Sequence, residues 1–171
     1  VELTKYALDI ANDVFGNYVM QKLIEQGNFE QKLNQAGYDL LNSKQMEPAL
    51  YVFELNTKLY PTSANAWDSF AEANWKADKT EKAIEYYNKA IELDPEFAGA
   101  YLNRGVSRDH LQDTKGAMAD FTKTVELDPK FDEAYNKRGV LKAELQDYRG
   151  AMADFTKAIE VNPRNANAFF N

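Results

Sequence analysis

The sequence predicts an all-α protein built from repeated pairs of antiparallel helices. Four prolines stand 34 residues apart in the 171-residue chain: Pro61, Pro95, Pro129 and Pro163. This period is typical of a helix-turn-helix unit that stacks into an α-solenoid. A second observation is that residues 117–123 and 151–157 have the same sequence, AMADFTK. Because repeat arrays commonly present binding surfaces, the pattern favours a binding protein over an enzyme.

Registering the chain on the prolines divides it into segments of one length. The expected segments are residues 30–63, 64–97, 98–131 and 132–165, with a non-matching segment at 1–29 and a truncated fifth repeat at 166–171. In the second repeat we predict a first helix over residues 66–77, a turn at Asp78 and Lys79, and a second helix over residues 80–93. Asp94 and Pro95 should end that helix, because a residue before proline avoids the helical conformation. Pro48 is expected in the first turn of its helix, where no backbone donor is lost.

Two positions of each repeat carry only small residues, and a third carries aromatic ones. The eighth residues are Gly37, Ala71, Gly105 and Gly139; the twentieth are Ala49, Ala83, Ala117 and Ala151; the twenty-fourth are Phe53, Tyr87, Phe121 and Phe155. Small residues are needed where paired helices approach closely, since a larger side chain would overpack the contact. Met20, Met46, Met118 and Met152 recur on helix faces, and we expect them to fill the core.

The pattern over residues 30–171 strongly resembles the tetratricopeptide repeat family. The fourth residue is aromatic in three repeats (Trp67, Tyr101 and Tyr135), and proline stands at position 32 of all four. The resemblance implies a right-handed superhelix whose concave groove binds peptides or helices. Arg104, Arg138 and Arg108 depart from the family pattern, which has Leu or Tyr there. Their aliphatic stems should pack while their charged heads reach solvent or carboxylates.

The resemblance also implies which residues line the groove. We expect these contacts from Asn34, Tyr38, Leu41, Asp68, Glu72, Trp75, Leu102, Asn103, Val106, Asn136 and Lys137. Family members that capture carboxylate termini need a clamp of Lys, Asn and Arg. Here Asp68, Glu72 and Glu133 stand at clamp positions, whereas Asn103 and Lys137 are compatible with it. We therefore expect a neutral or basic peptide or protein segment as partner. The alternative is that these residues coat a groove that stays empty.

The first 29 residues resemble a different helical family. We predict helices over residues 4–12 and 17–26, closed by Gly27. Residues 13–22 (DVFGNYVMQK) closely resemble a Pumilio repeat, a single-stranded RNA-binding unit. The resemblance implies that Asn17 and Gln21 read a uracil edge while Tyr18 stacks on the base. Asn17 and Gln21 are four residues apart and share a helix face.

A single Pumilio-like repeat is expected to act as a structural cap. Stacking of one base contributes roughly 1–3 kcal/mol, whereas association costs an estimated ~4–15 kcal/mol. The Pumilio-like segment runs into the first tetratricopeptide repeat through one shared helix, without a linker. This junction favours an engineered chimera. Two alternatives remain open: RNA binding through Asn17, Tyr18 and Gln21, and a natural tetratricopeptide adapter.

Composition excludes several classes of function. The net charge of −7 disfavours nucleic acid and anionic membranes as partners, and the absence of cysteine excludes thiolate metal sites. No apolar run is long enough to span a membrane, and no signal segment is evident, which favours a cytoplasmic location unless the protein is engineered. His110 is the lone histidine and is expected on a solvated helix end. No catalytic motif is present, so we expect no enzyme, cofactor or metal site.

The sequence predicts an incompletely covered C-terminal end. Terminal repeats require a polar outer face, but the chain ends six residues into the fifth repeat. We expect partly exposed apolar surface around Tyr135, Ala151, Phe155 and Ile159. Such surface favours weak end-to-end self-association. Residues 164–171 are expected to fray.

Overall fold

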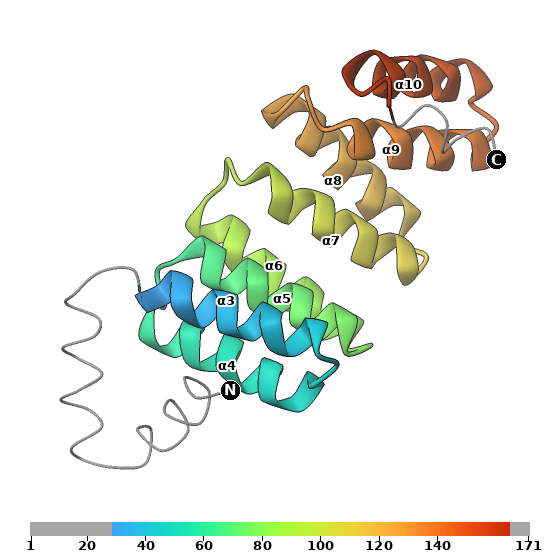
Figure 1. The fold of residues 1–171 in the computed structure, drawn as a ribbon. Helices are drawn as coiled ribbons and strands as arrows, with labels where there is room; N and C mark the ends of the chain where they lie inside the picture. Colours follow the sequence, from blue (N-terminus) through green and yellow to red (C-terminus); the bar gives the residue numbers. More distant parts are fainter. Residues whose placement is uncertain (1–28, 165–171) are drawn as a thin grey trace, which may run out of the picture. The chain divides into compact units, whose positions relative to one another are not determined.

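The computed structural model describes residues 29–164, in which all regular secondary structure is α-helical (Figure 1). The described helices fall into two compact units, which divide between Leu93 and Asp94. The first contains α3 (Phe29–Asn42), α4 (Met46–Leu59), α5 (Ala64–Lys76) and α6 (Thr80–Leu93). The second contains α7 (Ala98–His110), α8 (Thr114–Leu127), α9 (Asp132–Glu144) and α10 (Tyr148–Val161). The predicted all-α fold of helix pairs is confirmed.

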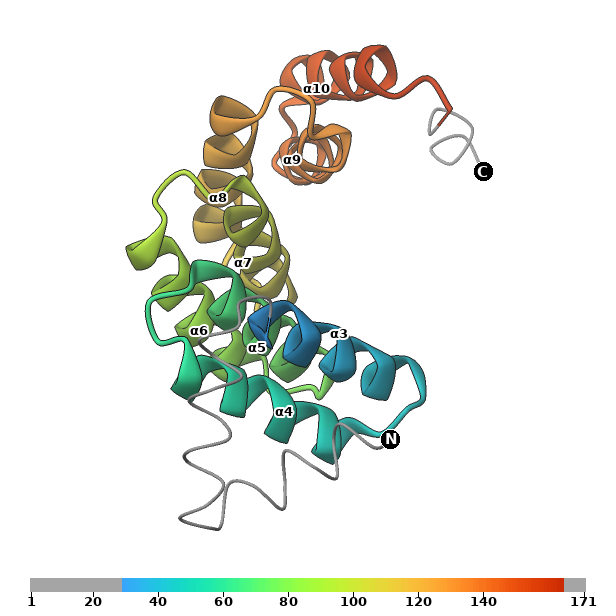
Figure 2. The same cartoon turned by 60° about the vertical axis from the view of Figure 1, so that its left-hand side comes forward.

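Within each unit, consecutive helices pack against each other (Figures 1 and 2). α3 packs on α4, α4 on α5, and α5 on α6; α3 also touches α5. In the other unit α7 packs on α8, α8 on α9, and α9 on α10. The first helix of one repeat therefore meets the first helix of the next within the N-terminal unit, which brings residues 34 positions apart together.

The helix boundaries follow local capping. α6 begins and ends at the predicted residues, and Pro48 lies in the first turn of α4 as predicted. The predicted start of α5 at residue 66 was two residues late, because the Ser63 hydroxyl caps the helix by accepting a hydrogen bond from the Ala66 N–H at 3.2 Å. The predicted end at residue 77 was one residue late.

Each helix pair is joined by the same tight turn, centred on a residue with positive φ. These residues are Lys44, Asp78, Gln112 and Gln146, with φ of 59°, 60°, 62° and 64°. The turn after α7 shows the pattern: Asp113 N–H donates to Arg108 C=O at 2.9 Å, and Gln112 N–H donates to Asp109 C=O at 2.8 Å. These two bonds form a Schellman motif, which satisfies carbonyls left free at a helix end. Asp113 then caps α8 by accepting from Gly116 N–H at 2.9 Å.

The small residues predicted at the eighth position hold the helix pairs together. A methyl group built on Gly105 would lie 2.7 Å from the Phe121 ring, and one on Gly139 would lie 2.7 Å from the Phe155 ring. On Gly37 it would lie 2.5 Å from the Phe53 ring. Each glycine therefore receives an aromatic ring directly on its helix backbone, as the requirement for close helix packing predicts.

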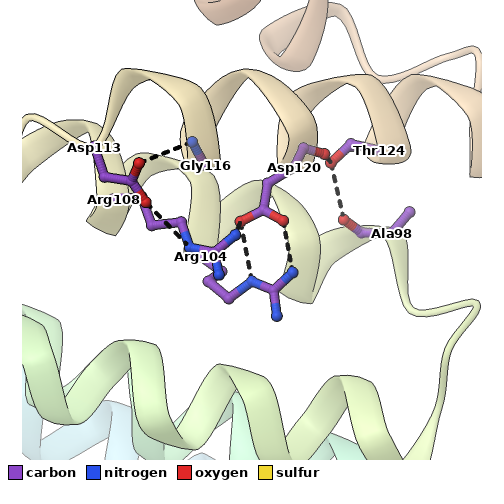
Figure 3. A network of polar contacts seen from close by, with 7 residues as sticks. All are labelled: Ala98, Arg104, Arg108, Asp113, Gly116, Asp120 and Thr124. Carbon is purple, nitrogen blue, oxygen red and sulfur yellow. Dashed lines mark hydrogen bonds and ion pairs between the residues drawn. The ribbon is translucent and has the colours of Figure 1, made fainter.

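The charged heads of Arg104 and Arg138 contact buried carboxylates. The sequence predicted that they would reach either solvent or carboxylates. Arg104 Nη2 lies 2.6 Å from Asp120 Oδ1, and Arg108 Nη1 lies 2.8 Å from Asp120 Oδ2 (Figure 3). In the next repeat Arg138 Nη2 lies 2.7 Å from Asp154 Oδ1. Each pair joins the two helices of one repeat with a bidentate, charge-assisted contact.

The face of α10 differs from two predictions. Ala151 is buried, at 3% exposure, rather than exposed, and Met152 is 68% exposed rather than core filler. Met118, its equivalent in the preceding repeat, packs against the core because α9 follows it. α10 is the last described helix, and no described helix covers its outer face. Tyr148 on α10 and Leu145, which directly follows α9, are exposed as well, while Tyr135, Phe155 and Ile159 are half-buried.

Candidate functional site

One face of the N-terminal unit brings together polar residues from α3 and α5. The groove residues predicted on these two helices, here called the α3–α5 face, are Asn34, Tyr38, Leu41, Asp68, Glu72 and Trp75. Tyr38 and Glu72 stand 34 residues apart, and the Tyr38 hydroxyl donates to Glu72 Oε2 at 2.8 Å. It also lies 3.3 Å from Ser69 Oγ. The structure thus brings Tyr38 and Glu72 into direct contact.

The α3–α5 face is acidic. Asp68 is only 8% exposed, and Glu72 Oε1 forms an ion pair with Lys76 at 2.7 Å. Burial raises the pKa of Tyr38, and the charge of Glu72 raises it further against the opposing effect of the Ser69 hydrogen bond. Burial also raises the pKa of Tyr87, with contributions from the Asp68 and Glu72 charges. The charges of both carboxylates therefore contribute to the raised pKa of each of these two tyrosines.

Apolar side chains frame this acidic face. Leu41 is half-buried and packs on the core cluster that contains Leu33 and Phe53. Trp75, at the end of α5, is 37% exposed and offers an accessible indole ring. A large, rigid and amphipathic ring of this kind is a common anchor in protein interfaces.

The remaining predicted contacts lie in the C-terminal unit and differ in accessibility. Asn103, Val106, Asn136 and Lys137 are half-buried. Leu102 is 5% exposed and packs in the core with Ala117 and Phe121, so it does not offer the accessible apolar surface expected of a contact residue. Sequence spacing alone did not distinguish it from its neighbours.

Two asparagines share an unusual feature at the fifth position of their repeats. The Oδ1 atoms of Asn34 and Asn136 are buried and have no hydrogen-bond partner among the described residues. Most buried polar groups in native proteins are hydrogen-bonded, and an unmade bond is costly. Both acceptors are therefore candidates for pairing with donors of a bound segment.

Sequence reasoning missed a cavity of about 420 Å³ between α4, α5 and α6. It shares no residue with the α3–α5 face. A signal for it was available in the spacing of Glu47, Tyr51 and Glu54, which places all three on one face of a helix.

The remaining predicted sites lie partly inside and partly outside the described residues. Asn17, Tyr18 and Gln21 lie outside the described residues. His110 is exposed at the end of α7, as predicted. Across residues 29–164, no group of three potential metal-binding side chains occurs. Within the same range, every helix falls short of the length and hydropathy needed to cross a bilayer.

Comparison with known families identifies the repeats. A TPR repeat model matches residues 76–108, and a tetratricopeptide repeat model matches residues 98–131 and 132–165. Together these matches span residues 76–165, which is more than half of the 171-residue chain.

Curated relatives match a shorter segment. The mitochondrial import receptor subunit TOM70 of Rattus norvegicus is 32% identical over 74 residues, which cover 43% of this chain and 12% of that protein. The Homo sapiens protein of the same name is 34% identical over 65 residues, which cover 38% of this chain and 11% of the relative. The chain thus matches only about an eighth of the length of these relatives.

Solved structures share the fold. A crystal structure of MamA matches with a TM-score of 0.72 and 24% identity, covering 89% of this chain and 90% of that one. The peptide-binding TPR protein YrrB matches with a TM-score of 0.69 and 18% identity over 98% and 86% of the two chains. The first TPR of Spaghetti, bound to the HSP90 peptide SRMEEVD, matches with a TM-score of 0.65 and 23% identity over 68% and 93%. The family models and these shared folds lead to one conclusion: the chain belongs to the tetratricopeptide repeat family.

Proposed function

We propose that this protein is a non-catalytic scaffold that binds a peptide or protein segment through its tetratricopeptide repeats. The α3–α5 face supplies the main contacts within the N-terminal unit. In the C-terminal unit, taken by itself, the proposed contacts are Asn103, Val106, Asn136 and Lys137. Tetratricopeptide repeat proteins serve as binding scaffolds, and YrrB and Spaghetti are described as peptide-binding members. The observation that carries the proposal is the contact of Tyr38 with Glu72, beside buried Asp68 and exposed Trp75.

The charge of this face selects neutral or basic segments. Asp68 and Glu72 repel an acidic peptide, and like-charge juxtaposition at an interface discriminates strongly against the wrong partner. A basic segment would instead gain the attraction of both carboxylates. The apolar surface of Leu41 and Trp75 would hold its aliphatic or aromatic side chains.

The buried asparagine acceptors support an extended backbone in the ligand. Asn34 Oδ1 has no described partner, and a peptide N–H would supply the missing donor after a small rotation of the side chain. Forming this hydrogen bond on binding would stabilise the complex, because the free-energy cost of an unpaired buried acceptor would be relieved.

A selection among random peptides tests the proposal. Immobilised full-length chain should enrich neutral and basic sequences, and a fluorescein-labelled enriched peptide should show saturable anisotropy. The acidic peptide SRMEEVD should bind more weakly than the enriched peptide. The double variant D68N/E72Q should weaken the basic peptide at least about tenfold. The matched control E81Q neutralises an exposed carboxylate on α6, away from the α3–α5 face, and should leave binding unchanged.

Preferential binding of SRMEEVD, or equal effects of D68N/E72Q and E81Q, would refute the assignment of this face. Enrichment of no peptide motif would refute the scaffold function itself.

The same proposal includes an engineered origin, with the Pumilio-like segment acting as a cap rather than as an RNA site. The linker-free junction of two repeat families and the net charge of −7 support both parts. Titration with a uridine-rich RNA oligonucleotide should show no submicromolar binding. Submicromolar binding that is lost in Tyr18→Ala would contradict the cap, and detection of this junction in a native proteome would contradict the engineered origin.

A further inference from the structure

The cavity between α4, α5 and α6 has the dimensions of a ligand site. Its volume is about 420 Å³, within the range of roughly 300–1,000 Å³ typical of small-molecule and side-chain pockets. It lies entirely within the N-terminal unit and shares no residue with the α3–α5 face. The lining residues are Glu47, Leu50, Tyr51, Glu54, Phe70, Asn74, Lys79, Lys82 and Tyr86.

Charged and aromatic side chains line the cavity. Glu47, Tyr51 and Glu54 line the cavity from α4, whereas Lys79, which directly precedes α6, and Lys82, on α6, contribute positive charges. Two of the aromatic lining residues stack on each other: the ring centroids of Phe70 and Tyr86 lie 4.5 Å apart with an interplanar angle of 25°. Burial raises the pKa of Tyr86, and the charges of Glu85 and then Glu54 raise it further. The charge of the Glu54 carboxylate therefore affects the Tyr86 side chain in the cavity lining.

The C-terminal unit shows what occupies the equivalent positions 68 residues later. Arg138 stands where Phe70 does, and Asp154 stands where Tyr86 does. The Arg138 guanidinium contacts Asp154 Oδ1 through Nη2 at 2.7 Å and Asp154 Oδ2 through Nε at 2.8 Å. Its Nη1 also donates to Thr122 Oγ1 at 3.3 Å. The chain thus places a guanidinium of its own at these positions in one unit, whereas the other unit has an open cavity.

The N-terminal unit has a carboxylate, Glu54, at the position where the C-terminal unit has the hydroxyl of Thr122. Thr122 corresponds to Glu54, so a guanidinium in the cavity would meet a carboxylate where Arg138 meets a hydroxyl. It would also meet aromatic faces, on which guanidinium groups stack favourably. We propose that the cavity between α4, α5 and α6 binds an arginine side chain of a partner peptide, with Glu54 as its acceptor and Tyr51 and Tyr86 as its aromatic contacts.

The existing ion pairs of the two glutamates leave this site accessible. Glu54 Oε1 pairs with Lys58 at 2.6 Å, but that lysine side chain is 67% exposed and does not line the cavity. Glu47 Oε1 pairs with Lys79 at 3.8 Å, and the Glu47 side chain is 84% exposed. Exposed pairs of this kind are weak and exchange readily, whereas a guanidinium can bind a carboxylate in bidentate geometry.

The positive charge of Lys82 allows a cationic ligand of the cavity to be distinguished from an anionic one. It has no ion pair among the described residues and lines the cavity from α6, whereas Glu54 lines it from α4. Its charge opposes a cationic ligand, so neutralising it should strengthen arginine binding. For an anionic ligand the same change should weaken binding. The sign of the K82Q effect therefore identifies the charge of the ligand.

Heteronuclear NMR of the isotope-labelled full chain provides the test. N-acetyl-L-arginine amide should cause saturable shift changes at Tyr51, Glu54 and Tyr86, with smaller changes for N-acetyl-L-lysine amide and none for N-acetyl-L-glutamate amide. E54Q should weaken the arginine probe at least about threefold, and K82Q should strengthen it about two- to threefold. The control variant E81Q, whose exposed carboxylate does not line the cavity, should leave the shifts unchanged.

A second variant transfers the arrangement of the C-terminal unit. F70R/Y86D should place a guanidinium in the cavity and abolish the arginine-dependent shifts while the far-ultraviolet circular dichroism stays helical. Should this variant not fold, E54Q and K82Q decide the question alone. The proposal is overturned by absence of saturable shifts at the cavity, by tighter binding of the glutamate probe, or by weaker binding of the arginine probe to K82Q.

Discussion

Replacing Gly105 by alanine should destabilise the C-terminal unit, although alanine is the better helix former. In the middle of α7 the exchange by itself gains about 1 kcal/mol of helix propensity. The added methyl group, however, would lie 2.7 Å and 2.9 Å from two atoms of the Phe121 ring and 3.1 Å from Asp120 Cβ. Phe121 is completely buried, so the ring has no free space into which to move.

The size of the effect follows from these opposing contributions. Overpacking of a rigid core costs about 1–3 kcal/mol, and an overlap of several tenths of an ångström with a fully buried ring favours the upper part of that range. The expected net loss is about 1–2 kcal/mol. For a chain of this length it corresponds to a decrease in melting temperature of roughly 2–8 °C.

Thermal and urea unfolding followed by circular dichroism measure this loss. Gly99→Ala is the matched control on the same helix, because its methyl group would meet only the half-buried Phe97 ring at 3.2 Å. The double variant G105A/F121L should recover part of the stability, since the smaller side chain leaves room for the methyl group. If G105A were as stable as the wild type, or if F121L gave no recovery, the glycine–aromatic contact would not be the constraint described here.

Three further predictions concern charge and exposed surface. Asp120→Asn should lower the free energy of unfolding by about 3 kcal/mol in urea titrations, because it leaves the Arg104 guanidinium, whose side chain is only 13% exposed, without its carboxylate. Burial alone would raise the pKa of Asp154, but the hydrogen bonds from Arg138 and Lys142 and their charges hold it below its ordinary value. Its contribution to stability is therefore present above the unfolded-state pKa and is lost as pH falls through the lower folded-state pKa, so Asp154→Asn should flatten the acid limb of a stability–pH curve. Met152→Glu should abolish any weak self-association seen in sedimentation equilibrium at high protein concentration.

Each of these predictions has a control. Glu92→Gln removes an exposed ion pair with Lys89 and should change the free energy of unfolding by less than about 1 kcal/mol. If D120N were no more harmful than E92Q, the buried network would not stabilise α7 against α8. An acid limb unchanged in D154N would contradict the depressed pKa. A strictly monomeric wild-type chain would remove the case for self-association through α10.

The repeat period allowed the helix pairs to be predicted because it fixes packing geometry as well as length. The small residues at positions eight and twenty were predicted where the paired helices approach closely, and the structure adds that the ring of Phe121, at position twenty-four, lies directly on Gly105. The conformation of the turns was less accessible. Lys44, Asp78, Gln112 and Gln146 adopt positive φ without being glycine, because the helix-end hydrogen bonds favour that conformation.

The candidate sites were only partly predictable. The register brought Tyr38 and Glu72 to one face, since helices of successive repeats pack side by side. It did not separate the buried Leu102 from its half-buried neighbours, because burial depends on how far the neighbouring helix covers each position. The pairing of Arg104 with Asp120 and of Arg138 with Asp154 had a signal in the shared 16-residue offset, which becomes visible only once the two helices of a repeat are known to be antiparallel.

The most direct test of the peptide-binding account is chemical-shift mapping of the chain with the enriched basic peptide. The account predicts saturable shifts concentrated at Tyr38, Glu72 and Trp75, including the Trp75 indole N–H, and their loss in D68N/E72Q but not in E81Q. Shifts confined to other surfaces of the described residues, or shifts at this face that survive D68N/E72Q unchanged, would contradict it.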